Sequence, residues 1–108
     1  MRIIYNKIIP FKGFSAINLF GVIFAREGQT ITPPTINHEK IHTAQMRELG
    51  YIGFYILYFL EWLYRLCVDT KRAYRAISFE QEAYAHQRDY NYLNERKHFA
   101  MWRKDGNE

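Results

Sequence analysis

The stretch that decides the fold is residues 32–50, which read TPPTINHEKIHTAQMRELG. Threonine can cap free amide groups at a helix start, and proline is tolerated in a first helical turn, so Thr32-Pro33-Pro34-Thr35 predicts where a helix begins. Gly50 predicts where it stops, because glycine readily adopts the left-handed conformation that ends helices. We therefore expect a helix over about residues 34–49.

This helix carries the pattern His38-Glu39-Lys40-Ile41-His42. Residues four apart lie on one helical face, so the two imidazoles can converge on one ion, while Ile41 is available to face a core. Glu39 is displaced by one residue, which lets its carboxylate reach a water in an open metal position. The pattern predicts a zinc site with His38 and His42 as ligands and Glu39 as the general base. The competing interpretation is a chance pair of solvated or hydrogen-bonded histidines, although the full match is uncommon, on the order of a percent or less in so short a chain.

The next segment, residues 51–68, is almost entirely apolar or aromatic and predicts a second helix. Glu61 and Arg65 are four apart, where a helix would let them pair. The purely apolar part is shorter than a bilayer requires, and extending it to Val68 includes both charges. We expect this helix to pack in the core or to form a homo-oligomer surface, with contact between its tyrosines and tryptophans and a membrane surface as the alternative.

A third helix is expected from Ser78 as far as Lys97. Ser78-Phe79-Glu80-Gln81 resembles a capping box, in which the serine and a residue three positions later satisfy free amide groups. The preceding residues 69–76 are polar and basic, and no assignment is made for residues 98–108.

The amino-terminal part favours β-structure. Residues 2–9 are rich in isoleucine, residues 17–25 form a second run, and Pro10-Phe11-Lys12-Gly13 between them supplies turn chemistry. We expect a two-stranded antiparallel ribbon. With the helices it predicts an α+β fold in a single domain over residues 1–108: a short antiparallel β-ribbon followed by three main helices.

Catalytic zinc generally takes three protein ligands, so a third must come from outside the histidine pair. Cys67 lies in the apolar segment, where we expect a buried and inert thiol. The candidates on the third helix are Glu80, Glu82 and His86.

His38-Glu39-Lys40-Ile41-His42 followed by Glu80-Gln81-Glu82-Ala83 resembles the gluzincin zinc metallopeptidases, in several of which the downstream glutamate ligand opens a Glu-x-x-Ala-Asp motif. The size and the order of ribbon and helices are similar to the minigluzincins, the minimal members of that group. The resemblance implies a metallopeptidase-like core, Glu80 as the third zinc ligand in preference to Glu82 or His86, and a peptide or protein substrate. It also implies that residues 17–25 form an edge strand beside the metal, where an extended peptide could add itself.

Two further residues near the pattern have open roles. Tyr84 stands where those relatives often have an aspartate that supports the site without binding the ion; a tyrosine could donate a hydrogen bond to an oxyanion or simply pack. Gln45, one turn beyond His42, could orient a ligand or a substrate, or could be an exposed polar residue.

The charge of the chain is moderately basic, at +4. The basic residues are scattered without a nucleic-acid-binding signature, so we expect no nucleic-acid partner. The group near Lys71, Arg72 and Arg75 indicates a solvated surface or attraction to an anionic membrane. The amino terminus lacks the features of a cleaved export signal, and we expect a cytoplasmic protein, with membrane association as the alternative.

The function expected from these patterns is that of a zinc-dependent metallopeptidase, a hydrolase that cleaves peptide bonds through a metal-activated water. The alternative is a non-catalytic zinc-binding scaffold or a membrane-associated interaction module.

Overall fold

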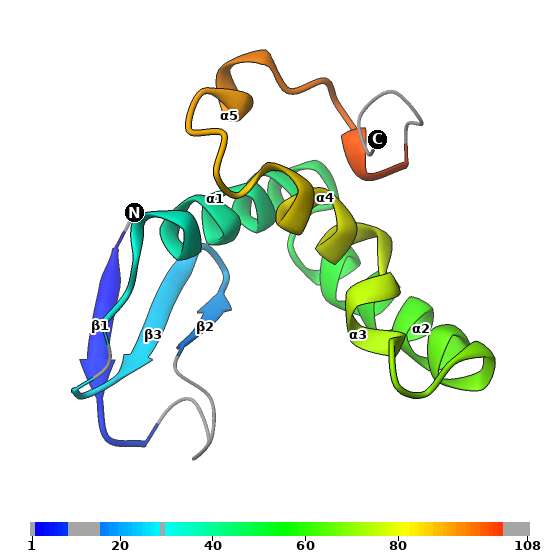
Figure 1. Ribbon diagram of the computed structural model, residues 1–108, viewed down its shortest axis with the longest axis horizontal. Helices are drawn as coiled ribbons and strands as arrows, with labels where there is room; N and C mark the ends of the chain where they lie inside the picture. Colours follow the sequence, from blue (N-terminus) through cyan, green and yellow to red (C-terminus); the bar gives the residue numbers. More distant parts are fainter. Residues whose placement is uncertain (1, 9–15, 29, 103–108) are drawn as a thin grey trace.

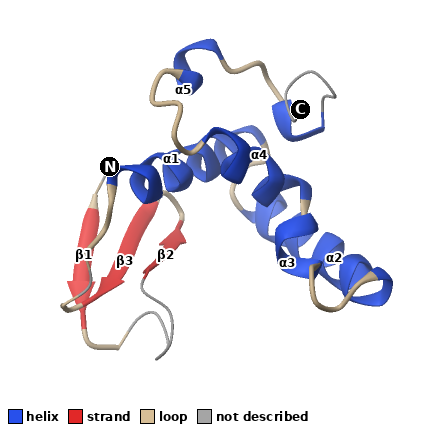
Figure 2. Ribbon diagram, viewed as in Figure 1, coloured by secondary structure: helices blue, strands red, loops and turns tan. Residues whose placement is uncertain are grey.

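The computed structural model describes residues 2–8, 16–28 and 30–102. A small sheet is followed by helices, so the expected α+β class is confirmed (Figure 1, Figure 2). The strands are β1 (Ile3–Asn6), β2 (Ala16–Leu19) and β3 (Val22–Arg26), and the helical elements are α1 (Pro33–Glu48), α2 (Ile52–Val68), α3 (Ala73–Ala76), α4 (Ser78–His86), α5 (Tyr92–Glu95) and the 3-10 helix η1 (Ala100–Trp102).

The sheet has the order β1-β3-β2, with β1 parallel and β2 antiparallel to β3. The expected ribbon was therefore wrong in its pairing, because residues 17–25 form a hairpin by themselves. Phe20 and Gly21 make its turn with φ angles of 52° and 89°, the positive values that two-residue hairpin turns require. A phenylalanine rarely signals such a turn, so the run looked continuous. The turn expected at residues 10–13 lies outside the described residues.

Helix α1 begins and ends close to the predicted positions. Pro33 and Pro34 occupy its first turn, but Thr32 donates no side-chain cap and its hydroxyl contacts Thr35 Oγ1 at 3.0 Å instead. At the other end Gly50 has a φ of +70°, and the Tyr51 amide donates to the Met46 carbonyl at 2.7 Å. This is the bond pattern of a glycine-terminated helix.

The expected third helix is divided into two. Helix α4 ends at His86, and α5 covers only Tyr92–Glu95. The side-chain amide of Asn37, on α1, lies 2.9 to 3.1 Å from the carbonyl oxygens of His86, Gln87 and Asp89. These carbonyls are thus occupied by α1, and the chain turns away at that point.

The beginning of α4 is capped by a residue of another helix. Ser78 does not form the expected capping box; its amide and hydroxyl both donate to the Glu61 carboxylate, at 2.7 and 2.9 Å. Glu61 therefore binds the start of α4, although its spacing of four residues from Arg65 would also allow a pair on the helix.

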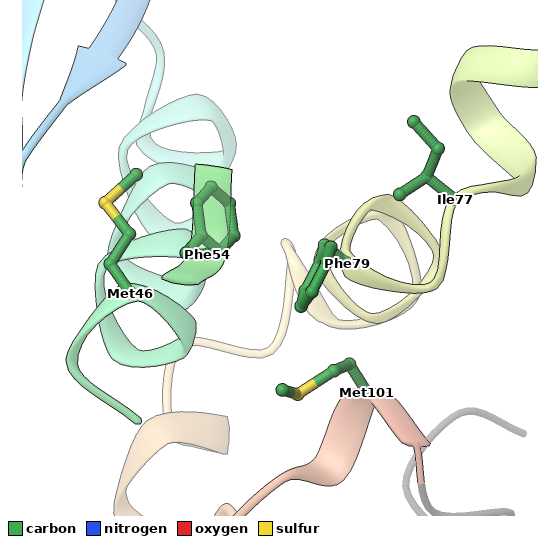
Figure 3. Packing of buried hydrophobic residues seen from close by; sticks show 5 residues of the cluster. All are labelled: Met46, Phe54, Ile77, Phe79 and Met101. Carbon is green, nitrogen blue, oxygen red and sulfur yellow. The ribbon is translucent and has the colours of Figure 1, made fainter. Parts of the chain in front are cut away.

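The main core cluster joins α1, α2, α4 and η1, and Figure 3 shows its side chains facing one another. Its members are Met46, Phe54, Ile77, Phe79 and Met101. A second cluster places Ile41 of α1 against Ala83 of α4, so Ile41 faces the core as expected. The two clusters fix α1 and α4 side by side, which positions the site described below.

Helix α2 is only half buried. Phe54 is its single buried residue, and Ile56 and Leu60 are more than half exposed. Cys67 is exposed as well, so the expectation of a buried thiol was wrong. In Figure 1, α2 and α3 extend together away from the sheet. Within the described residues no single helix is long and apolar enough to cross a bilayer; α1 and α2 meet that criterion as a pair, but they bend by 109° at their junction.

Candidate metal centre

Three side chains from two helices converge at the junction of α1 and α4. The Nε2 atoms of His38 and His42 lie 3.1 Å apart, and each lies 3.0 Å from Oε1 of Glu80. His42 and Glu80 are buried, and His38 is mostly buried. This group could hold a metal ion.

Both histidine rings are held from behind by glutamine amides. Nδ1 of His38 lies 2.9 Å from Oε1 of Gln87, and Nδ1 of His42 lies 2.8 Å from Oε1 of Gln45. An amide oxygen can only accept, so each Nδ1 carries a hydrogen, and the Nε2 atoms are directed toward Glu80. The amide nitrogen of Gln45 donates to the carbonyl of Phe79 at 3.0 Å, which fixes which end of that amide faces the ring.

Glu80 is held in its ionised form. Burial alone would raise its pKa, but His42 and the hydrogen bonds from His38, His42 and Tyr58 outweigh burial and lower the pKa far below its ordinary value. Tyr58 donates to Oε2 at 2.7 Å, and both burial and the Glu80 charge raise the pKa of this phenol. Oε2 is thus occupied by Tyr58, while Oε1 faces the two histidines.

The centre favours a positive charge. Burial lowers the pKa of His42, yet the nearby Glu80 carboxylate outweighs it, and with Glu39 and Gln45 raises the pKa to about 9. A metal cation could supply the same charge in place of that proton.

Glu39 faces a pocket beside the three residues. Burial raises its pKa, against the opposing effects of His42 and His38. Its Oε2 is buried and has no hydrogen-bond partner among the described residues. Its backbone carbonyl accepts from Asn18 at 2.9 Å and from Thr43 at 3.1 Å, which ties α1 to β2. A buried carboxylate oxygen without a protein partner is costly, and it suggests a water or ligand as the partner.

The pocket has a volume of about 410 Å³, within the range of ligand sites. Ala16, Ile17 and Asn18 of β2 form one side, and aromatic residues of α2 and α3 form another. Glu39, His42 and Glu80 also line it. Most of the lining is apolar, so a ligand would meet a few polar groups in a largely apolar cleft.

The two alternative third ligands lie elsewhere. The carboxylate of Glu82 is fully buried and accepts hydrogen bonds from Gln45, Tyr92 and Arg96. The ring of His86 stacks on Tyr92 with 3.7 Å between centroids. Among the described residues, Glu80 is the carboxylate that meets the histidine pair.

Tyr84, at the position of the expected aspartate, packs beside His38. The two rings meet edge to face at 4.7 Å between centroids, and the guanidinium of Arg75 lies 4.1 Å over the tyrosine ring. Hydrogen bonding to His38 is supplied by Gln87, three residues further along the chain.

Sequence reasoning missed Gln87 and Tyr58. Gln87 follows Glu80 by seven residues, which is two turns on the same helical face, so this spacing could have identified it. Tyr58 lies on another helix, and its contact with Glu80 depends on how α2 is placed. No local pattern marks it among the many aromatic residues of α2.

No protein-family model matches the chain, and searches of the curated proteins and of the solved structures found no match. The geometry of the site is therefore the basis on which a function is assigned.

Proposed function

We propose that this protein is a zinc-dependent peptidase of the gluzincin type, with His38, His42 and Glu80 as the metal ligands. The observation that carries the proposal is the convergence of their three donor atoms, 3.0 to 3.1 Å apart. Tetrahedral zinc with ligands at about 2.0–2.1 Å separates them by about 3.3 Å, close to this spacing. Two imidazole nitrogens and one carboxylate oxygen suit zinc, whereas magnesium and calcium prefer oxygen ligands.

Zinc bound there would lower the pKa of a water molecule and polarise a substrate carbonyl. Glu39 is the base that takes the proton of the attacking water and passes it to the leaving amine. Support for this role comes from its position, since its carboxylate lines the same pocket as His42 and Glu80. Its Oε2, for which the described part of the chain offers no hydrogen-bond partner, is free to accept such a proton.

The proposed substrate is a peptide bound in an extended conformation along β2. This strand ends the order β1-β3-β2, so within the described part of the chain one of its edges has no strand partner. Ala16, Ile17 and Asn18 of this strand also line the pocket. An added strand would pair with the backbone of β2, and the apolar lining would accept an apolar side chain of the peptide.

The test of catalysis is Glu39→Gln, which keeps the shape of the side chain and removes its basicity. We expect turnover of a peptide library to fall by about a hundred- to ten-thousand-fold while one zinc per chain is retained. Glu27→Gln, on a half-exposed side chain in a loop, is the matched control and should retain full turnover. Equal turnover in Glu39→Gln and wild type would exclude Glu39 as the base.

The test of the metal site is elemental analysis of protein purified without chelator. His42→Ala should lose zinc, whereas His98→Ala, whose side chain is 91% exposed, should keep it. Zinc that persists in His42→Ala would overturn the ligand assignment. Zinc binding without cleavage of any library peptide would favour the non-catalytic scaffold over the peptidase.

A further inference from the structure

The outward face of α2 is defined here by its six side chains that are more than half exposed, namely Ile52, Ile56, Phe59, Leu60, Tyr64 and Val68. At roughly 100° per residue they span about half of the helix circumference. None of them carries a charge. The solvent side of a helix in a globular protein normally carries charged and polar residues, so this face has the composition of a buried surface.

The two charged residues of α2, Glu61 and Arg65, lie outside this face. The Glu61 carboxylate binds the amide and hydroxyl of Ser78 at the start of α4. Arg65 lies one turn further along, and its Nε atom is buried. Glu61 is thus turned toward the protein, whereas the Arg65 guanidinium lies 5.6 Å over the ring of Tyr64. The outward face itself carries apolar and aromatic side chains, which is the reverse of the usual pattern in water.

The width of this face indicates what kind of partner covers it. A single partner helix, including α2 of a second copy, contacts a coiled-coil seam, which is narrower than the apolar stripe of about 100° or more that packs against a globular core. A lipid surface covers half of a cylinder lying in its plane. The observed span of about half of the circumference therefore fits lipid better than a single helix.

The positive charges next to the outward face indicate which kind of lipid it binds. Lys71 and Arg72 lie three and four residues after Val68, in the loop that follows α2, and both are exposed. The acid in this loop, Asp69, accepts the backbone amide of Lys71 at 3.2 Å. Two exposed cations at the end of an apolar helix suit anionic headgroups.

We propose that the outward face of α2 lies in the plane of an anionic lipid bilayer, immersed at the level of the headgroup and acyl-chain boundary. The helix has 17 residues and is about 25 Å long, less than the hydrocarbon thickness, and it is fixed along its inner side to α1 and α3. It therefore lies on the bilayer rather than crossing it. This binding is independent of the peptidase activity.

The first experiment is flotation of the full chain with vesicles. Wild type should float with phosphatidylcholine vesicles that contain about one-third phosphatidylserine. Ile56→Asp/Leu60→Asp should reduce this binding on the order of 100-fold, because both side chains would leave the lipid. Ile8→Asp/Tyr90→Asp changes two hydrophobic residues elsewhere that are at least as exposed, and it should bind like wild type.

The second experiment uses Lys71→Gln/Arg72→Gln. Each lost cation should weaken binding to the anionic vesicles by about five-fold. Equal binding to neutral and anionic vesicles by wild type would overturn the assignment of anionic lipid. Circular dichroism of each variant establishes that the helices are intact.

The third experiment measures immersion directly at Cys67, the only cysteine of the chain, which is exposed on α2. An environment-sensitive fluorophore on Cys67 should shift to the blue with anionic vesicles, and quenching lipids should place it about 5–10 Å deep. The same fluorophore in Cys67→Ser/Tyr90→Cys should not shift. No flotation and no shift for wild type, or a lipid-free dimer that Ile56→Asp/Leu60→Asp dissociates, would overturn the proposal, the latter in favour of a second copy.

Discussion

At the scale of single residues, the two histidines of the site owe their orientation to glutamines. Gln45 and Gln87 each accept a hydrogen bond from an Nδ1 atom, at 2.8 and 2.9 Å. A neutral amide fixes the ring without adding negative charge, so the negative charge of the centre comes from Glu80 and Glu39. Partners of this kind usually tune metal affinity strongly.

Gln87→Met should weaken zinc binding about 10- to 100-fold, because methionine fills similar space but does not hold the His38 ring. Competition with a chromophoric chelator measures the affinity. Gln87→Glu restores an acceptor and should recover most of the affinity, and Gln81→Met, on the exposed side of α4, should leave it unchanged. Equal affinity in Gln87→Met and wild type would show that the hydrogen bond has no role.

The histidine pair itself was predictable, because two residues four apart on a helix share a face whatever surrounds the helix. Glu80 was named only through a family resemblance, since nothing local to it indicates that α4 packs against α1. For Gln45 the sequence allows either a supporting or an exposed role, and the structure shows it fully buried. Burial of such a residue depends on long-range packing that residue spacing does not contain.

At the scale of elements, one helix holds the beginning of another. Glu61 of α2 accepts two hydrogen bonds from Ser78, the first residue of α4. A negative charge at a helix amino terminus is also favoured by the aligned peptide dipoles. Because α4 carries Glu80, this contact links α2 to the metal centre.

Glu61→Ala should lower the free energy of unfolding by about 2 kcal/mol, since it leaves a partly buried amide without a partner. It should also weaken zinc binding through α4. Urea denaturation in the presence of chelator measures the first effect separately from the second. Glu95→Ala, on an exposed side chain of α5, should change neither. Unchanged urea denaturation of Glu61→Ala would contradict the proposed role of this contact.

Helices α1 and α2 were predicted nearly to the residue, because α1 begins at a proline pair, Gly50 separates the two helices, and the apolar run of α2 ends where polar residues begin at Asp69. The strand pairing was not predicted correctly, because β1 and β3 are parallel and their pairing is set by contacts between residues distant in sequence. The division between α4 and α5 was missed for a similar reason, since the carbonyls at that break are bound by Asn37 of α1.

At the scale of the whole molecule, the carboxyl-terminal segment is fastened to α1 and α4 by ion pairs. Arg96 binds Glu82 and also Glu48 at 2.9 Å, and the Phe99 amide donates to Glu48. Burial alone would raise the pKa of Glu48, but the hydrogen bonds from Arg96 and Phe99 outweigh it and lower the pKa below its ordinary value.

The stabilisation by Glu48 should therefore depend on pH. A carboxyl group whose pKa is lowered in the folded state stabilises fully above its unfolded pKa, about 4.5, and loses this effect as the pH falls through the folded value. The difference in unfolding free energy between wild type and Glu48→Gln should thus be constant near neutral pH and shrink below about pH 4.5. Denaturant titrations from pH 7 to pH 3 measure it; a difference that stays constant would contradict the assignment.

Helix α2 exposes apolar side chains on one side, while Phe54, Tyr55 and Tyr58 on its other side line the pocket. Under the two proposals above, the immersed face and the cleft lie on opposite sides of one helix, which is about 10 Å in diameter. This diameter and the depth of immersion together fix the distance from the membrane surface at which a chain is cut. A peptide would then be selected by how far its scissile bond stands from the membrane surface as much as by its residues, so substrates would be membrane-anchored chains with an extended juxtamembrane segment.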